Sequence, residues 1–420
     1  IRTLGSMGHF TAEAIAPDIQ LVVNSDELVD INWPLEEIAS DQFQIAGGWG
    51  GGTFVGSVGV TLNNLSIKNF FKKGAWRPYP MGQNQRLSIS AQTNGTYYKA
   101  FAISFTDPWM GGRKPNSFTI SAHYSDENNA YYAWQKGTRY FRTAGVAAGL
   151  GKRLDWPDPY FTFYAEASYE RYMLKDWNTF VLKNGAANLL SIRLVLGRNS
   201  VDQPIYPRRG SDFSVSVQLT PPYSLWDGKD YKSTALSEQE RYNWIEFHKW
   251  MLKGQWFTPL TRNGNLVLMA RAEMGYLGHY NKNKVSPFER FEVGGDGMTG
   301  YNMYGIDIIS MRGYDDGALD PVGSNYSCAY NKYTMELRYP LLLKGQTNIY
   351  VLGFLEGGNG FTSWKEFSPF KIKRSAGIGV RLFLPVVGMV GVDWGWGFDP
   401  AAGQTKRSGS HIHFTMGMQF

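Results

Sequence analysis

Apolar and polar residues alternate with a period of two along most of the chain from Phe43 to Phe420. In residues 213–220, for example, phenylalanine, two valines and leucine alternate with serine, serine, glutamine and threonine. Because successive side chains of a β-strand point to opposite faces, this period predicts strands with one apolar face. The runs that follow it number about sixteen: 43–50, 53–62, 86–95, 98–106, 117–126, 138–150, 159–171, 179–198, 211–221, 244–259, 264–278, 331–340, 347–357, 374–384, 387–397 and 411–420.

The second face of these strands separates two kinds of β-protein. A water-soluble sandwich explains any single strand, because it buries one face and exposes the other. It fits the set poorly, since the strands reach 10 or more residues and the second face combines glycines with Glu166, Glu170, Arg193, Arg271, Glu273, Arg381 and Asp393. Aromatic residues also gather near strand ends, as in the interfacial girdles of membrane barrels. The pattern favours an all-β fold, a closed antiparallel transmembrane barrel of about sixteen strands.

Composition is consistent with this fold. No apolar run in the 420 residues approaches the roughly 18 that a membrane helix needs, so a helical membrane protein is excluded. A membrane barrel is not excluded, because its lipid-facing and lumen-facing residues alternate. An even number of strands would return both ends of the barrel to the same side of the membrane.

Residues 1–41 follow a different pattern. The end of a helix is expected over 1–7, followed by strand-like runs at 10–23 and 27–37 with a turn between them. Two strands and a helix end cannot bury a core alone. We therefore expect residues 1–41 to be the C-terminal part of a small α+β module whose beginning is missing, and residues 42–420 to form the barrel.

Charge and rare residues limit the chemistry. The net charge is +6, and the basic residues are dispersed rather than gathered in one patch, which argues against a nucleic-acid partner. The lone cysteine, Cys328, excludes an internal disulfide and a cysteine metal cluster. His411 and His413 have a spacing that can bind metal, but no third ligand is suggested. No catalytic set is recognisable, so we expect no enzymatic activity, no cofactor and no metal.

A long connection between two strand patterns, residues 287–321, has no strand pattern of its own. Connections of this length are usually functional or disordered. It is rich in glycine, which lets a backbone fold back on itself, and its centre is Met311-Arg312-Gly313-Tyr314. A planar guanidinium can be held by two carboxylates at once. We interpret the connection as a loop that folds inward and is pinned by Arg312.

These motifs together resemble the BamA family of outer-membrane β-barrel assembly proteins. The run 287–291, the pair Gly294-Gly295, the motif 311–314 and the run 319–321 match, in order, the sixth extracellular loop of that family. Two shorter segments, 206–210 and 105–109, resemble its periplasmic turns. The resemblance implies a sixteen-stranded barrel in the outer membrane of a Gram-negative-type bacterium. It also implies that residues 1–41 are the end of the last POTRA domain, on the periplasmic side.

The resemblance also implies partners for the loop arginine. In the family this arginine projects into the lumen and pairs with acidic residues of the two following strands, which correspond here to Glu336 and Glu356. The family commonly has aspartate where this chain has Glu356. Either glutamate could instead be an ordinary lumen-facing charge. A further departure is the long basic and aromatic segment 63–85, which we expect on the periplasmic side as a tolerated loop or as a contact for lipid headgroups or a partner.

The two ends of the barrel sequence predict a weak seam. The first strand contributes Phe43, Ile45, Gly47 and Gly48, and the last strand contributes Phe414, Met416, Gly417 and Phe420. A terminal aromatic residue resembles the β-signal of outer-membrane proteins. Glycines raise the cost of ordering the first strand. The seam could therefore open and template an incoming strand, although the glycines could instead only accommodate curvature.

The resemblance implies a factor that folds and inserts β-barrel proteins into the outer membrane through this seam. Its expected partners are nascent outer-membrane β-barrels, accessory assembly subunits including periplasmic lipoproteins, and outer-membrane lipid. The alternative within the same superfamily is a two-partner-type secretion pore, which moves an extended polypeptide through its lumen. A diffusion porin is a third reading and would conduct ions steadily.

Overall fold

The computed structural model describes residues 17–21, 28–35, 41–50, 53–76, 78–93, 97–112, 114–129, 137–203, 205–297, 306–323, 326–344, 347–384 and 388–416. Within 42–50 it describes the strand backbone and not the side chains. The dominant element is a 16-stranded sheet, in which every neighbouring pair of strands is antiparallel.

The strands of this sheet are long, as predicted. All of them have between 9 and 16 residues. Their bounds are β3 Gln42–Gly50, β4 Thr53–Leu65, β5 Gln85–Thr93, β6 Tyr98–Asp107, β7 Asn116–Asn128, β8 Tyr140–Arg153, β9 Phe161–Lys175, β10 Gly185–Asn199, β11 Gly210–Leu219, β12 His248–Pro259, β13 Val267–Gly278, β16 Ala329–Lys344, β17 Thr347–Phe361, β18 Lys373–Leu384, β19 Gly388–Pro400 and β20 Arg407–Met416.

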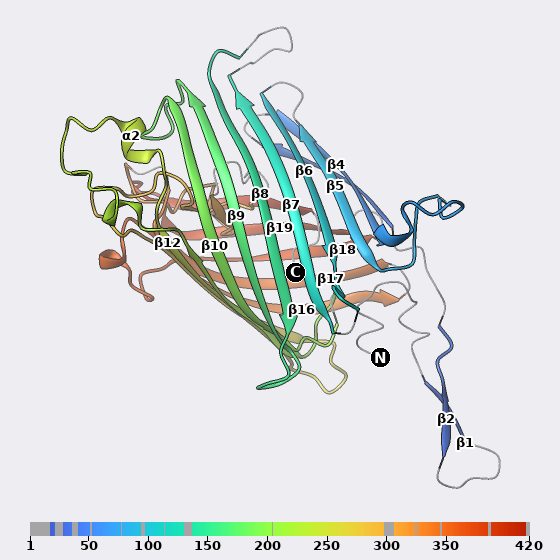
Figure 1. Cartoon of the computed structure of the whole chain (residues 1–420). Helices are drawn as coiled ribbons and strands as arrows, with labels where there is room; N and C mark the ends of the chain where they lie inside the picture. The colour runs from blue at the N-terminus through green and yellow to red at the C-terminus, as the bar shows by residue number, and fades with distance from the viewer. Residues whose placement is uncertain are drawn as a thin grey trace.

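The sheet follows the order of the chain and curls round on itself, so that β16 to β19 lie behind β6 to β10 (Figure 1). One pairing spans a long connection, between β13 and β16. The order begins at β3 and ends at β20, and no pairing between these two strands occurs among the described residues. The first and last strands of the barrel sequence, β3 and β20, are therefore also the two outermost strands in the sheet order.

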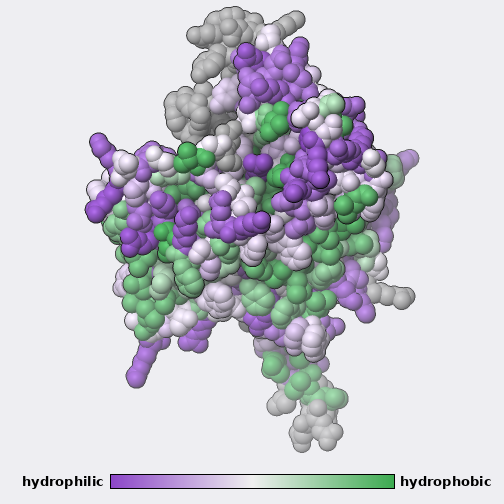
Figure 2. Space-filling view, turned by 90° about the vertical axis from the view of Figure 1, so that its left-hand side faces the viewer, coloured by the Kyte–Doolittle hydropathy of each residue, from purple (hydrophilic) through white to green (hydrophobic). Residues whose placement is uncertain are grey.

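The strands bury their polar face and expose their apolar face. In β19, Asp393 is 0% exposed, whereas its neighbours Val392 and Trp394 are 44% and 45% exposed. Hydrophobic side chains form a band on the outer surface, with hydrophilic groups above it (Figure 2). Water-soluble proteins have the opposite arrangement. A lipid-facing exterior around a polar interior explains it and is typical of a membrane barrel.

The largest buried cluster lies inside the cylinder. It joins the lumenal side of β8, β9 and β10 to the connection between β13 and β16. The ring of Phe288 stacks on that of Tyr172 with centroids 4.4 Å apart, and Phe180 meets Phe288 edge-on. The connection is therefore held inside the barrel by packing as well as by charge.

The N-terminal segment contains a short antiparallel hairpin of β1 Asp18–Leu21 and β2 Val29–Asn32. The hairpin extends away from the cylinder (Figure 1). Ile19 and Ile31 are exposed, so the hairpin buries no core of its own. The predicted helix end over 1–7 lies outside the described residues. The assignment of residues 1–41 to a POTRA domain stays a prediction.

In the described segments, helices are few and short. They are α2 Glu238–Tyr242 and the 3-10 turns η2 Ile67–Asn69, η3 Tyr223–Leu225 and η4 Trp364–Glu366. In the part of the chain that the structure describes, no helix combines the length and apolar character that a membrane crossing requires.

Candidate functional site

The connection between β13 and β16 has its own small framework. It contains two three-residue strands, β14 Phe291–Val293 and β15 Asp307–Ile309, which pair in parallel. The sequence did not predict these strands, because three residues are too few to show a period. The N–H group of Met311 donates to the carbonyl of Gly295 at 2.8 Å, and that of Leu319 donates to the carbonyl of Val293 at 3.0 Å. These bonds present the 311–314 motif to the barrel wall.

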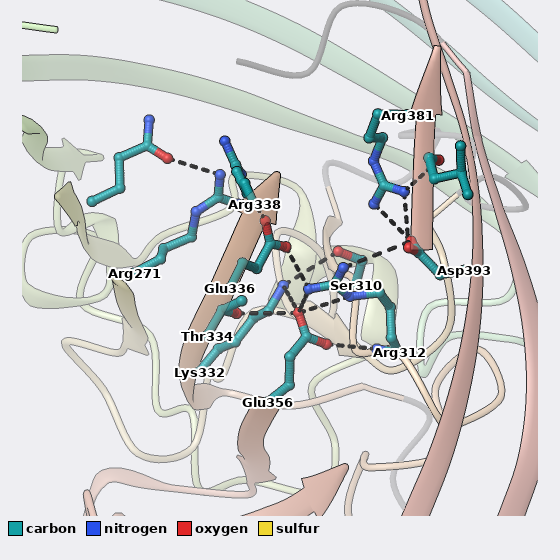
Figure 3. A network of polar contacts seen from close by, with 12 residues as sticks. Arg271, Ser310, Arg312, Lys332, Thr334, Glu336, Arg338, Glu356, Arg381 and Asp393 are labelled. Atoms are coloured by element: carbon teal, nitrogen blue, oxygen red, sulfur yellow. Dashed lines mark hydrogen bonds and ion pairs between the residues drawn. The ribbon is translucent and has the colours of Figure 1, made fainter. Parts of the chain in front are cut away.

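Arg312 lies at the centre of a polar network (Figure 3). Its Nη2 atom donates to Oε1 of Glu336 and to Oε1 of Glu356, both at 2.7 Å. Its Nε atom donates to Oε1 of Glu356 at 3.1 Å, and its backbone N–H donates to Oε2 of Glu356 at 2.8 Å. The structure therefore places both glutamates named from the sequence on this guanidinium. The longer glutamate side chain reaches the contact for which the family commonly uses aspartate.

A third carboxylate completes the network. Oδ2 of Asp393, on β19, lies 3.7 Å from Nη1 of Arg312. Asp393 also accepts two hydrogen bonds from Arg381, at 2.8 and 2.7 Å, and Glu336 accepts one from Nε of Arg338 at 2.8 Å. Three carboxylates thus share three guanidinium groups. Bidentate contacts of this kind are stronger and more directional than simple ion pairs.

Two further features stabilise the charge of Arg312. Its guanidinium carbon lies 3.7 Å from the centroid of the Phe354 ring, a cation–π geometry. Burial by itself would lower the pKa of Arg312, but the carboxylates of Glu356, Glu336 and Asp393 outweigh burial and raise that pKa. The arginine therefore stays charged, and its position depends on these partners.

Gly313 lies so close to the barrel wall that there is no room for a side chain at this position. Its φ of +87° is a left-handed conformation that favours glycine. A Cβ atom there would lie 2.8 Å from Cβ of Ser375 and 3.0 Å from the backbone N of Gly397. On the other side, a Cβ on Gly395 would lie 2.8 Å from the backbone N of Gly313. Glycines of β19 and of the motif therefore allow the two backbones to touch.

The other two motif residues are fully buried. Met311 lies against the backbone of Gly358 in β17, since a Cβ on that glycine would come within 3.5 Å of the Met311 sulfur. The hydroxyl of Tyr314 donates to the carbonyl of Arg374 at 2.8 Å. All four residues of the motif therefore contact strands β16 to β20.

The loop also contacts the last strand. The N–H of Gly313 donates to Nε2 of His413 at 2.8 Å, and the N–H of Phe414 donates to Oδ2 of Asp296 at 3.3 Å. Nδ1 of His411 lies 3.2 Å from Oδ1 of Asp315. Three loop residues thus contact His411, His413 and Phe414 of β20. Sequence reasoning had considered the two histidines only as metal ligands.

A second anchor holds the start of the loop, and sequence reasoning did not identify it. Oε1 of Glu289 lies 3.1 Å from the hydroxyl of Tyr172, and Oε2 lies 3.3 Å from Nζ of Lys249. Lys249 also pairs with Asp307 at 2.7 Å. Burial raises the pKa of Glu289 to about 7. The only sequence signal was the run 287–291, which was noted as a motif without a role.

The structure describes the seam residues named from the sequence only in part. Phe43, Ile45, Gly47 and Gly48 lie on β3, of which the structure describes the backbone. On β20, Phe414 is exposed on the outer face, and Met416 ends the strand. Gly417 and Phe420 lie outside the described residues.

The lumen beside Arg312 contains a cavity of about 770 Å³ that reaches Glu336, Asp393 and His413. A second cavity of about 630 Å³ lies beside the Glu289 anchor and reaches His123 and Glu166. Among the described residues, no group of three or more histidine, cysteine, aspartate or glutamate side chains is placed to hold a metal ion.

Comparison with known proteins agrees with this arrangement. The chain matches the Omp85 superfamily domain over residues 81–420. It is 23% identical over 354 residues to the outer membrane protein assembly factor BamA of Neisseria meningitidis serogroup B. The aligned region covers 79% of this chain and 36% of that protein. The chain thus spans about a third of the length of that curated relative.

Two solved structures share the fold. BamA from Haemophilus ducreyi lacking POTRA domains 1–3 superposes with a TM-score of 0.60 at 18% identity, over 98% of this chain and 76% of that chain. CdiB from Escherichia coli superposes with a TM-score of 0.58 at 12% identity, over 97% of this chain and 68% of that chain. The predicted resemblance to BamA is confirmed by the sequence and fold matches. Together with the sixteen-stranded sheet, the domain match establishes that this chain belongs to the Omp85 superfamily of outer-membrane β-barrel proteins.

Proposed function

We propose that this protein folds and inserts β-barrel proteins into the outer membrane by opening the seam between β3 and β20. The observation that carries the proposal is that these strands end the sheet order and are not paired with each other among the described residues. The edge of a strand that has no partner on that side presents unpaired N–H and C=O groups. An incoming strand can pair with them by β-augmentation.

The driving force lies in the bilayer. Unpaired backbone groups cannot be satisfied by water inside the hydrocarbon region, so strand pairing is favoured more there than in the periplasm. A nascent strand that pairs with the seam therefore lowers its free energy as it enters the membrane. This step requires no nucleotide.

The loop contacts support a link between the lumen and the seam. Asp296 accepts from the N–H of Phe414, so this donor of β20 is occupied by the loop. Arg312 fixes the loop through Glu336 and Glu356 on β16 and β17. Movement of the loop would therefore change which groups of β20 are available for pairing.

The partners follow from this role. We propose that nascent outer-membrane β-barrels are the substrates. Accessory subunits, including periplasmic lipoproteins, would assist assembly, and outer-membrane lipid would surround the barrel. Residues 1–41 would face the periplasm as the end of the last POTRA domain. A polypeptide secretion pore is the alternative, and the sequence likeness to BamA over 79% of the chain favours assembly.

A disulfide across the seam tests the proposal. Single cysteines on β3, at positions 43–48, are paired with cysteines at 412–416 of β20, and the pair that cross-links is used. The oxidised protein should fail to insert substrate barrels, and reductant should restore insertion.

A lock between strands that already pair is the matched control. Trp394→Cys with Ile412→Cys joins β19 to β20 at an existing register pair and should leave assembly intact. Full activity of the seam-locked protein would rule out the lateral route. Normal assembly of other barrels in cells depleted of this protein would rule out the assembly function itself.

A further inference from the structure

The connection between β4 and β5 is a folded surface element, here called the aromatic loop, residues 66–83. The N–H of Ser66 donates to the carbonyl of Pro80 at 2.9 Å, and that of Gly82 donates to the carbonyl of Asn64 at 3.0 Å. The side chain of Asn69 donates to the carbonyl of Met81 at 3.1 Å. These bonds join the two ends of the loop, so its described residues fold back on themselves rather than extend freely.

Three aromatic rings of this loop form one exposed cluster. Phe70 and Phe71 meet edge-on with centroids 5.3 Å apart, and Phe70 and Trp76 do so at 4.9 Å. Phe71 is 92% exposed, and the other two rings are also exposed. The indole N–H of Trp76 donates to the carbonyl of Phe70 at 3.0 Å, which fixes the cluster. A rigid apolar cluster in water marks an interaction surface.

The charge of the loop is of one sign. Residues 66–83 contain three lysines and one arginine and no aspartate or glutamate. Lys68, Lys72 and Lys73 are all exposed and lie within the same short segment as the rings. Lysines beside exposed aromatic rings suit the boundary between phosphate headgroups and acyl chains.

The loop directly follows a strand with an exposed apolar face. Val58 of β4 and Ile89 of β5 are exposed on the outer face of the barrel, and Ile67, at the start of the loop, is exposed as well. The loop projects from the barrel wall at the end that also carries the N-terminal segment (Figure 1). There the hydroxyl of Tyr79 donates to both carboxylate oxygens of Asp41, at 2.6 and 2.8 Å.

From these observations we infer that the aromatic loop binds the membrane surface beside β4 and β5. The three rings enter the headgroup region, and the lysines bind the phosphates of anionic phospholipid. Since Tyr79 bonds to Asp41, which immediately precedes β3, lipid binding also fixes the start of the first strand. The inference does not depend on the assembly function.

Lipid quenching of a single label tests this directly. The full chain with Cys328→Ser and Phe71→Cys carries a polarity-sensitive fluorophore and is placed in vesicles of phosphatidylcholine and phosphatidylglycerol. Part of the lipid is brominated near the glycerol end of its acyl chains. The label at 71 should lose most of its emission, as should a label at Val58→Cys on the barrel wall.

Phe370→Cys supplies the matched control, because Phe370 is also an almost fully exposed aromatic residue, 90%, but lies between β17 and β18. Its label should keep its emission in brominated vesicles and be quenched by aqueous iodide. If the label at 71 also keeps its emission in brominated vesicles and is quenched by iodide, the aromatic loop does not bind the membrane and the inference is wrong. No partner protein is present in the vesicles, so quenching at 71 cannot come from one.

The role of the lysines has its own readout. With the lysines present, brominated phosphatidylglycerol should quench the label at 71 more than the same fraction of brominated phosphatidylcholine. Lys68→Gln, Lys72→Gln and Lys73→Gln together should remove this difference while leaving quenching by brominated phosphatidylcholine. Equal quenching by the two lipids in the chain that keeps its lysines would overturn the anionic preference.

Discussion

The backbone N–H of Gly313 donates to Nε2 of His413 at 2.8 Å, which joins the loop motif to the last strand of the barrel. Gly313 follows Arg312 directly, so the residue that binds β16 and β17 and the residue that binds β20 are neighbours in the chain. A displacement of the motif must therefore change both sets of contacts.

Replacing Arg312 by alanine should loosen the loop, because it leaves Glu336 and Glu356 buried with fewer cationic partners. Breaking a buried ion pair from one side costs about 3–5 kcal/mol. Arg312→Lys should recover only part of this, since an ammonium cannot donate in the planar fork that the two carboxylates accept. Protease cleavage within 306–323 of the folded barrel measures the loop, and a substrate-insertion assay measures the function.

Arg374→Ala is the control for that variant. Arg374 makes an exposed pair with Asp399, and Tyr314 bonds only to its backbone carbonyl. The change should leave the loop protected. An Arg312→Ala protein with normal protection and normal assembly would show that the buried network has no role in either.

Gly313→Ala should destabilise the loop for two separate reasons. The left-handed backbone costs an L-residue about 1–2 kcal/mol, and the new Cβ would press on Ser375 and on the backbone of Gly397. Gly323→Ala separates the reasons, because Gly323 has a φ of +78° and open space around its Cβ position. The loop should become more protease-sensitive in the first variant than in the second. Equal effects would mean that close packing against β19 contributes nothing.

Removing the acceptor at Asp296 should release one backbone donor of the last strand. In the unaltered protein the N–H of Phe414 is bonded to Asp296, so it should exchange slowly with solvent deuterium. Asp296→Ala should accelerate exchange in the peptide that contains Phe414. Asp315→Ala, which removes only the contact to the His411 side chain, should leave that exchange unchanged. Unaltered exchange in Asp296→Ala would show that the contact between Asp296 and Phe414 does not protect this N–H group.

The Glu289 anchor should depend on pH. Burial raises the pKa of Glu289 from 4.5 to about 7, so the folded loop favours the protonated form. A group with a raised pKa contributes stability that is fully present below its unfolded pKa and is lost as pH rises through its folded pKa. Loop protection should therefore fall as pH rises between about 4.5 and 7, and Glu289→Gln should remove this part of the pH dependence.

Asp320 should add a second dependence on pH. Burial raises its pKa from 3.8 to about 8, although Ser327 and the N–H of Val293 donate to its Oδ1 atom. By the same sign rule, its contribution is lost as pH rises towards about 8. Asp320→Asn mimics the protonated carboxyl and should protect the loop at pH 8 relative to the unaltered chain. A Glu289→Gln, Asp320→Asn double variant with the original pH profile would show that neither group controls it.

The sequence by itself determined the strands and the charge that pins the loop. Period-two alternation is a local property of each strand, so it predicted about sixteen strands, and the sheet contains 16. The 311–314 motif and its resemblance to a known family named Arg312, Glu336 and Glu356, and the structure places these three side chains together. Their roles in assembly remain predictions.

Only the tertiary structure decided which distant residues meet inside the barrel. Asp393 and Arg381 could be recognised as lumen-facing from their position in the alternation, but not as neighbours of Arg312, because that depends on how far the loop descends. Likewise, Glu289 meets Tyr172 of β9 and Lys249 of β12 only because the loop enters the lumen beside these two strands. A period fixes the face of a strand on which a residue lies, whereas the curl of the sheet and the path of the loop fix which residue it faces.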